Sequence, residues 1–116
     1  MDDWAFDVED TLLAGFQEDQ LMLADIAGLN DAVNWKLREI KRNPRMVGTV
    51  CVVDGDVVYL ATTGRYRSGV PPLLIAYLLD ERRRIIRLFL LCKAKDDGFN
   101  ERVRRALRRG KRPRGH

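Results

Sequence analysis

Apolar residues form two dense runs near the middle of the chain. Residues 73–79 and 85–92 are almost continuously apolar, and the charged segment 80–84 separates them. Each run has the length of a strand, and a continuous rather than alternating pattern indicates strands that are covered on both faces or lie in the middle of a sheet. We therefore expect a central β-hairpin.

The amino-terminal part of the chain predicts one short strand and then helices. Residues 4–8 alternate apolar and polar positions, as a half-buried strand does. Over residues 12–27 the apolar positions are too dense for one stripe and glycines interrupt them, so two short helices or one irregular helix both fit. A clearer amphipathic helix follows, with Asn30 or Asp31 as its cap, and it ends before Pro44 because proline disfavours a helical residue ahead of it.

Turn residues divide the middle of the chain into a further pair of strands and a loop. Residues 46–53 and 57–62 flank an Asp54-Gly55 dipeptide, which is a strong hairpin signal. The polar segment 62–69, bounded by glycine and proline, is typical of a loop between strands. We therefore expect two consecutive hairpins joined by this loop.

The carboxy-terminal part predicts a basic amphipathic helix. Over residues 99–109 the apolar positions line one face, and arginines cover the other. Residues 110–116 lack an apolar anchor, so we expect a flexible basic tail. The whole order predicts a single α+β domain over residues 1–109, with a mostly antiparallel four- to five-stranded sheet, two N-terminal helices packed on one face and this basic C-terminal helix.

Charge is distributed unevenly along the chain. The net charge is +4, yet residues 1–81 carry seven basic and fourteen acidic side chains (−7), and residues 82–116 carry fourteen basic and three acidic ones (+11). Such a division is expected when the basic part binds an anionic partner, or when the two halves pair with each other. Ten of the basic residues follow Cys92, where acids are scarce, so we favour an external anion.

Several kinds of functional site lack the residues that they need. His116 is the single histidine and ends the chain, and the two cysteines, Cys51 and Cys92, lie far apart in sequence. We therefore expect no zinc site, no Ser-His-Asp or Cys-His site and no small-molecule cofactor. Both cysteines fall in predicted strands, where buried free thiols are the usual state.

The chain shows no sign of a membrane segment. No apolar run reaches the length of about 18 residues that a spanning helix needs. The acidic amino-terminal residues also differ from the basic-then-apolar order of a secretory signal. We therefore expect a cytoplasmic protein that does not contact a membrane.

Residues 70–109 carry a resemblance to a known family. A strand containing Tyr77 ends in an acidic pair, a second apolar strand closes on Lys93 and Lys95, and a helix places Ala106 among arginines. The matching segments are residues 73–81, 85–95 and 101–109. In these motifs and in its element order, the chain resembles the RelE/ParE superfamily of toxins from bacterial toxin–antitoxin systems, and most of all the HigB- and phage-type branch.

The resemblance implies a function. RelE-like members cleave messenger RNA in the ribosomal decoding site, ParE-like members poison DNA gyrase, and an antitoxin that wraps the toxin silences either kind. The family often carries an arginine a few residues before the strand tyrosine, where this chain has Leu74 and Ile75 ahead of Tyr77.

Cleavage of RNA through its own 2′-hydroxyl sets chemical requirements. The reaction needs a base for the hydroxyl proton, cations for the pentacoordinate phosphate and an acid for the departing 5′-oxygen. Without a histidine or a metal site, the available groups are lysine, arginine, tyrosine and the carboxylates. Arginine holds a phosphate with two parallel hydrogen bonds, and a lysine beside other cations can act as a base.

Two clusters meet these requirements. Arg65, Arg67, Lys93 and Lys95 are our candidate catalytic cations, and Tyr66, between the two arginines, is placed to stack on a base. Lys93 and Lys95 are two apart on a predicted strand and should share a face. An ordinary solvated loop and a solvated strand end are the alternative interpretations.

The last helix supplies the remaining candidates. Arg102, Arg105 and Arg109 are candidate nucleic-acid-binding residues, although an antitoxin could instead dock on the apolar face of this helix. Residues 82–84 are expected to form a solvated turn.

These observations lead to one main hypothesis and one alternative. The first is the toxin of a type II toxin–antitoxin system, a metal-independent endoribonuclease that cleaves ribosome-associated mRNA and is partnered by an antitoxin. The alternative is a non-enzymatic protein of the same fold that acts by protein binding, as a gyrase inhibitor or an inactive partner-binding relative.

Overall fold

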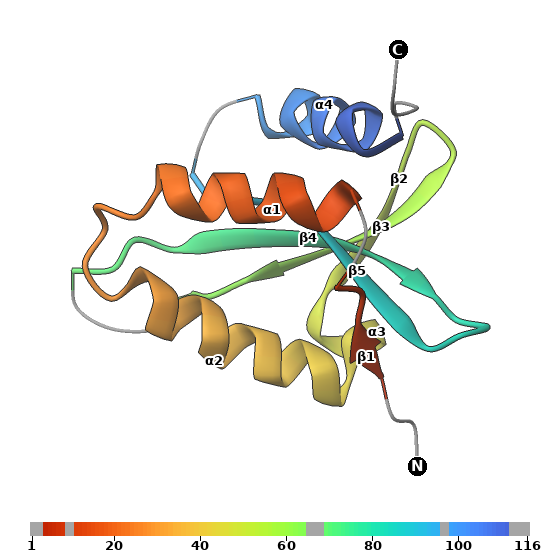
Figure 1. The fold of residues 1–116 in the computed structure, drawn as a ribbon, viewed down its shortest axis with the longest axis horizontal. Coiled ribbons are helices and arrows are strands. Elements are labelled where there is room, and N and C mark those ends of the chain that lie inside the picture. Colours follow the sequence, from red (N-terminus) through yellow and green to blue (C-terminus); the bar gives the residue numbers. More distant parts are fainter. Residues whose placement is uncertain (1–3, 9–10, 65–68, 96–97, 112–116) are drawn as a thin grey trace.

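The computed structural model describes residues 4–8, 11–64, 69–95 and 98–111. Within these ranges the elements in chain order are β1 (Ala5–Phe6), α1 (Thr11–Met22), α2 (Leu29–Arg42), α3 (Pro44–Val47), β2 (Thr49–Val53), β3 (Asp56–Thr62), β4 (Leu73–Asp80), β5 (Ile85–Lys93) and α4 (Phe99–Lys111) (Figure 1).

The described strands form one mixed sheet in the order β1-β5-β4-β3-β2. From β2 to β5 each neighbouring pair is antiparallel, whereas β1 runs parallel to the start of β5. The α+β class, the mostly antiparallel sheet, the two N-terminal helices and the basic C-terminal helix are thus as the sequence predicts.

Both hairpins follow from short-range signals. Asp54 and Gly55 take φ values of 50° and 85°, the left-handed conformation that a two-residue type I′ turn requires at both central positions. This turn sets Val53 opposite Asp56 and so fixes the register of β2 on β3. The β4–β5 turn is held by Asp80, whose carboxylate accepts hydrogen bonds from the backbone N–H and Nε of Arg83 at 3.1 and 2.8 Å.

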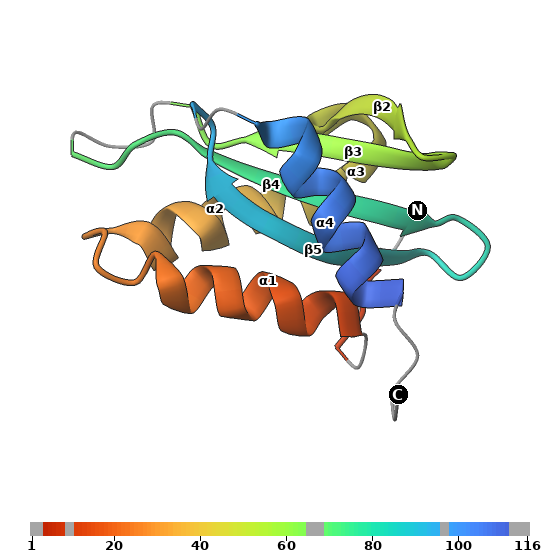
Figure 2. The ribbon, with the colours of Figure 1, turned by 90° about the horizontal axis from the view of Figure 1, so that it is seen from above.

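Two hydrophobic cores lie on opposite faces of the sheet. Phe16 of α1 and Val33 of α2 belong to the first core, and Val103 and Leu107 of α4 pack with Phe89 of β5 in the second. Figure 2 shows α4 crossing the sheet on one side while α1 lies alongside β5. The two central strands are therefore covered on both faces, which explains their continuous apolar runs.

The first two helices differ in detail from the expectation. α1 is a single regular helix up to Met22, so the version with one irregular or two short helices over the whole of residues 12–27 is wrong. α2 begins at Leu29, and Gly28 with a φ of 82° occupies the cap position in place of Asn30 or Asp31. The turn between the helices therefore brings the chain into α2 earlier than the polar residues suggest.

A short helix stands where the sequence predicts the start of a strand. α3 begins at Pro44, because the fixed φ of proline suits the first turn of a helix. Gly48 then returns to an extended conformation, and β2 starts at Thr49 instead of residue 46. β1 is likewise shorter than the predicted strand over residues 4–8.

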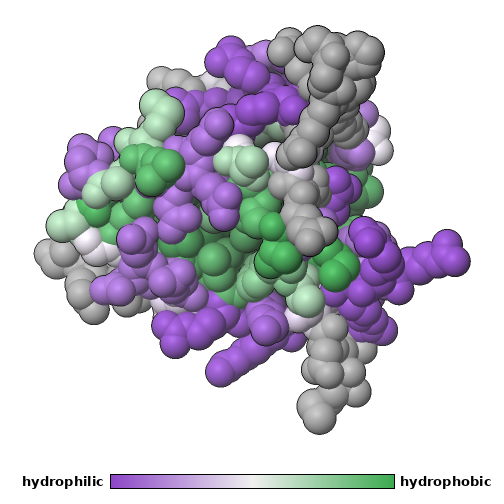
Figure 3. Space-filling model, viewed as in Figure 1, coloured by the Kyte–Doolittle hydropathy of each residue, from purple (hydrophilic) through white to green (hydrophobic). Residues whose placement is uncertain are grey.

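The face of the molecule that carries α1 and α2 is mostly hydrophilic, and hydrophobic residues gather between the two helices (Figure 3). In the described part of the chain, no helix combines the length and the apolar character that crossing a membrane requires.

Candidate nucleic-acid interface

A groove lies where α1, the second half of β5 and α4 meet. Figure 2 shows how these three elements lie relative to one another. It consists of two adjoining pockets of about 380 and 190 Å³, which share Asp19, Leu91 and Arg102 as lining residues. Its charged lining is Asp19, Lys93, Arg102, Arg105 and Arg109. We call it the α1–β5–α4 groove. Of the eight site residues that the sequence suggests, the structure brings four together here.

The groove exists because side chains complete the outer edge of β5. β1 pairs with Ile85 and Ile86, and farther along the strand α1 and α4 take its place. Asp19 Oδ2 accepts a hydrogen bond of 3.0 Å from the Leu91 N–H, and Arg109 Nη2 donates one of 3.5 Å to the Phe89 carbonyl. Arg109 Nη2 also lies 3.8 Å from Asp19 Oδ2. A carboxylate and a guanidinium thus stand in for a neighbouring strand.

Asp19 is the one acidic group in the described lining of the groove. Its side chain is 18% exposed. Burial raises the pKa of this carboxyl, while the hydrogen bond from Leu91 and the charge of Arg109 act in the opposite direction. Sequence reasoning did not single out Asp19, since it is one acid among many in the acidic half of the chain and its partner Leu91 is distant in sequence.

The arginines on α4 reach the groove because the helix is amphipathic. Val103, Ala106 and Leu107 are buried against the sheet. Arg102 and Arg105 are one turn apart, so they lie on one face beside the buried one, and both side chains are exposed. Lys93, exposed at the end of β5, adds a third cation from a different element.

Arg109 lies between α4, the edge of β5 and α1. Besides Asp19, its guanidinium lies 3.9 Å from the Glu18 carboxylate. It also occupies the space that a Cβ at Gly15 would fill, so the glycine lets α4 approach α1 closely. The contacts of Arg109 therefore hold α4 against α1 and the edge of β5.

Lys95 does not share the strand with Lys93. The β4–β5 pairing ends with Leu73 opposite Lys93, and the Ala94 N–H then donates to the Pro72 carbonyl as the chain turns. Lys95 lies in this turn and is exposed. The expectation that both lysines follow one strand and share a face is therefore wrong, because the strand ends two residues earlier.

Arg65, Tyr66 and Arg67 lie outside the described residues, so their positions stay predictions. The residues before them do have a place: the Thr63 N–H donates to the Leu73 carbonyl, and Thr63 Oγ1 accepts from the Leu73 N–H. Because Leu73 is opposite Lys93, Thr63 lies at the same end of the sheet as Lys93, about 10 Å away across two strand spacings.

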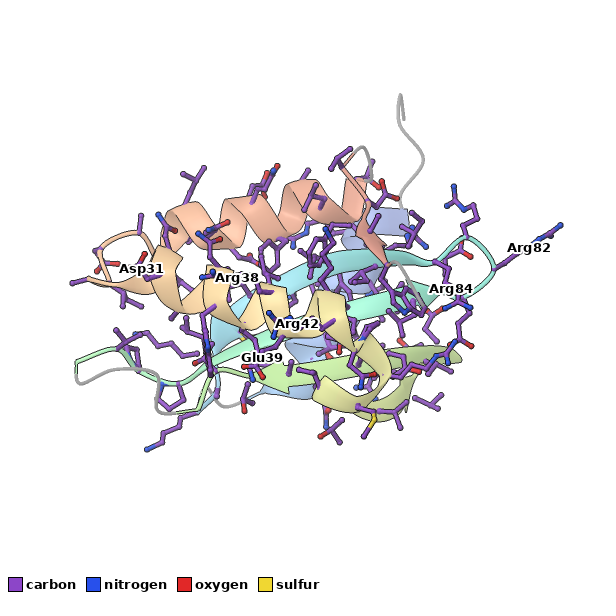
Figure 4. The ribbon with its side chains drawn as sticks, turned by 90° about the horizontal axis from the view of Figure 1, so that it is seen from below. Asp31, Arg38, Glu39, Arg42, Arg82 and Arg84 are labelled. Carbon is purple, nitrogen blue, oxygen red and sulfur yellow. The ribbon has the colours of Figure 1, made fainter. Side chains whose placement is uncertain are left out.

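Other arginines lie away from the groove, in separate places. Figure 4 shows Arg38 and Arg42 on α2, and Arg82 pointing outward from the tip of the β4–β5 hairpin. Arg84, in the same turn, has its guanidinium 5.7 Å from the centre of the Trp4 ring. Arg82 is exposed, and Arg83 is exposed and paired with Asp80, as the predicted solvated turn requires. The prediction is wrong for Arg84, which is half-buried because its guanidinium packs on Trp4.

The tyrosine of the central strand has a structural position. Tyr77 is fully buried, donates its hydroxyl to the Pro44 carbonyl at 2.6 Å and stacks on Tyr59 with the ring centres 5.5 Å apart. Burial also raises the pKa of Tyr77. This hydroxyl packs in the core on the α2 side and does not face the α1–β5–α4 groove.

The cysteines are free thiols, Cys92 buried and Cys51 half-buried. Among the residues that the structure describes, no group of three or more His, Cys, Asp or Glu side chains is arranged to hold a metal ion.

Comparisons with known proteins leave the chain without a family assignment: no family model, no curated protein and no solved structure matches it significantly.

Proposed function

We propose that this chain is the toxin of a type II toxin–antitoxin system that cleaves ribosome-associated mRNA without a metal ion, and that the α1–β5–α4 groove holds the RNA backbone. The observation that carries the proposal is the position of Lys93, Arg102 and Arg105. They come from two elements, line one groove and are all exposed.

The spacing of these cations suits a nucleic-acid strand. Side chains one helical turn apart have Cβ atoms about 5–6 Å from each other, which is close to the distance between successive phosphates. Arg102 and Arg105 can therefore contact neighbouring phosphates, with Lys93 facing them from β5. Contacts of this kind position a strand without reading its sequence.

Cleavage requires cations beside the reacting phosphate as well as along the strand. Lys93 and Lys95 lie at the end of the sheet where the segment with Arg65 and Arg67 begins, and these four residues are our candidates for stabilising the pentacoordinate phosphate. Tyr66 is the candidate for stacking on a base. The target places the protein in the cytoplasm, with an antitoxin as its protein partner.

A second candidate function is protein binding without cleavage, directed at gyrase or another partner. It is favoured by two exposed apolar residues at the end of α1: Leu21 and Met22 are 76% and 82% exposed, and Met22 also lines the groove. Exposed apolar side chains beside a polar groove are typical of a protein-binding surface.

A ribosome-dependent cleavage assay separates the two functions. Translating ribosomes are incubated with wild-type protein, Lys93→Ala, Arg105→Ala and, as a charge-matched control, Arg82→Ala at the hairpin tip. We expect mRNA cleavage by the wild type and the control, and losses of roughly 10- to 100-fold for each groove variant, the scale of one hydrogen bond to a charged group. Equal cleavage by all four proteins would remove the groove from the mechanism, and absence of cleavage by the wild type would favour the protein-binding function.

A further inference from the structure

The two edges of the sheet differ in how their outward-facing backbone groups are paired. At the β5 edge, β1 and the side chains of Asp19 and Arg109 take up outer backbone groups. At the opposite edge β2 ends the strand order, and no strand of the described residues pairs with its outer side. Edge strands usually carry a charge, a proline or a bulge that prevents pairing with another chain. β2 reads Thr-Val-Cys-Val-Val and pairs with β3 in continuous register, so it carries no such feature over these described residues.

The turn between β2 and β3 determines which backbone groups face outward. In a two-residue hairpin the pair beside the turn, here Val53 and Asp56, is hydrogen-bonded, and bonded and non-bonded pairs then alternate. The odd-numbered residues of β2 therefore direct their N–H and C=O groups toward β3. Val50 and Val52 direct theirs away from the sheet.

The same two valines also expose their side chains. Val50 and Val52 are 56% and 69% exposed, and Val57, opposite Val52 on β3, is 51% exposed. All three lie on the α2 side of the sheet, because Val53 packs in the core on the α4 side. An apolar stripe thus runs beside an open backbone edge.

We propose that two copies of this chain pair through β2, antiparallel, about a two-fold axis at Cys51. This axis sets Val50 of one copy opposite Val52 of the second, so the outward N–H and C=O groups of both residues are bonded, in four hydrogen bonds across the interface. An axis at Val50 or Val52 is also compatible with the bonding pattern but leaves part of the five-residue strand unpaired.

A second copy suits this edge better than another partner. The sequence around the axis, Val-Cys-Val, is the same in both directions and carries no charge to select a charged chain. Two-fold pairing also joins the valine stripes of the two copies on one face of a continuous sheet, as an isologous interface requires. The α1–β5–α4 groove lies at the other edge and stays open. One strand pair with a valine stripe falls below the standard interface of about 1,600 Å², so a weak, micromolar dimer is expected.

The mass in solution tests the proposal. Light scattering coupled to size exclusion, from low to several hundred micromolar protein, should show a rise from 13.4 kDa toward twice that value. Val52→Lys should weaken the dimer roughly 100-fold, since each copy contributes one lysine and symmetry therefore places the substitution in the interface twice. Val57→Lys is the matched control: the same change on the same face, one strand away from the pairing edge.

Crosslinking tests the register. At a non-hydrogen-bonded pair the two Cys51 Cα atoms would lie about 4.5 Å apart, within the range for a disulfide. Diamide, which accepts the two electrons and two protons of the thiol pair, should therefore yield a covalent dimer. Cys51→Ser should abolish this product, whereas Cys92→Ser should not, because Cys92 is 1% exposed. Thr49→Cys in the Cys51→Ser protein moves the two sulfurs to positions about 14 Å apart and should not crosslink.

Three results would overturn the proposal: a single-chain mass at every concentration, a dimer that Val52→Lys leaves unchanged, or equal crosslinking through residues 49 and 51. If the wild type is monomeric alone but binds another protein in a manner that Val52→Lys abolishes, the edge takes a different chain and pairing of two copies is wrong.

Discussion

Replacement of Gly48 by alanine tests the packing beneath the central strand. A Cβ at Gly48 would lie 2.5 Å from Tyr77 Oη and 3.0 Å from the Tyr59 Cβ. The backbone at Gly48, with φ −92° and ψ 147°, suits any residue, so the cost is steric. Tyr77 cannot move freely, because it is fully buried and its hydroxyl is bonded to the Pro44 carbonyl.

The magnitudes follow from these contacts. Overpacking of a buried site costs about 1–3 kcal/mol, and distortion of a buried hydrogen bond adds about 1 kcal/mol, so Gly48→Ala should lower the free energy of unfolding by about 2–4 kcal/mol. Tyr77→Phe alone leaves the Pro44 carbonyl without this donor and should cost about 1–2 kcal/mol. In the double variant the ring lacks the oxygen that the new methyl group meets. The two losses should therefore fall short of additivity by about 1–2 kcal/mol.

Urea unfolding of the four proteins, followed by circular dichroism, gives the complete cycle. A cost below about 0.5 kcal/mol for Gly48→Ala, within the usual effect of a surface substitution, would contradict the steric clash. An equal cost of Gly48→Ala in the Tyr77→Phe protein and in the wild type would show that the hydroxyl is not the group that resists the methyl.

Three further predictions concern the edge of β5 and the first hairpin. Arg109→Ala should lower the free energy of unfolding by about 1–2 kcal/mol, because a long hydrogen bond and partly exposed ion pairs are lost, and by less in an Asp19→Asn protein; additive losses in urea unfolding would contradict this. Since the pKa of Asp19 is raised above its ordinary value of 3.8, the folded state binds this proton more tightly than the unfolded state. The stability that proton binding by Asp19 contributes should be complete below pH 3.8, the ordinary pKa, and should be lost as the pH rises through the pKa of the folded state. Unfolding of wild type and Asp19→Asn measured against pH should therefore diverge in this window, and parallel curves would refute the assignment. Gly55→Ala should cost about 1–2 kcal/mol because the φ of 85° is left-handed, and an unchanged melting temperature would show that the turn relaxes.

Local signals in the sequence predict much of the fold. The Asp54-Gly55 turn, the two apolar runs and the amphipathic patterns of α2 and α4 each depend on residues a few positions apart, and each predicted element is present. The predicted strand start at residue 46 failed, because Pro44 favours the first turn of a helix. The chain forms α3 there, ahead of β2.

The closure of the sheet edge could not be predicted in the same way. Asp19 and Leu91 are 72 residues apart, and nothing in either neighbourhood indicates that a carboxylate takes the place of a strand. The role of Arg109 has the same origin: on the helix it resembles Arg102 and Arg105, and its distinct position depends on the space left by Gly15 of α1. Tertiary packing of this kind determines where each arginine of the helix lies.

The central claim is that Lys93, Arg102 and Arg105 hold an RNA backbone in one groove, and the affinity for single-stranded RNA against salt concentration tests it most directly. We expect the double variant Lys93→Ala/Arg105→Ala to bind more weakly, with a slope of log affinity against log salt reduced by about 1.4, two phosphate contacts at about 0.7 each. Arg38→Ala/Arg82→Ala, which removes the same charge from the α2 side and the hairpin tip, should keep the wild-type slope. Equal loss of slope in both double variants would show that net charge, and not the groove, binds the RNA.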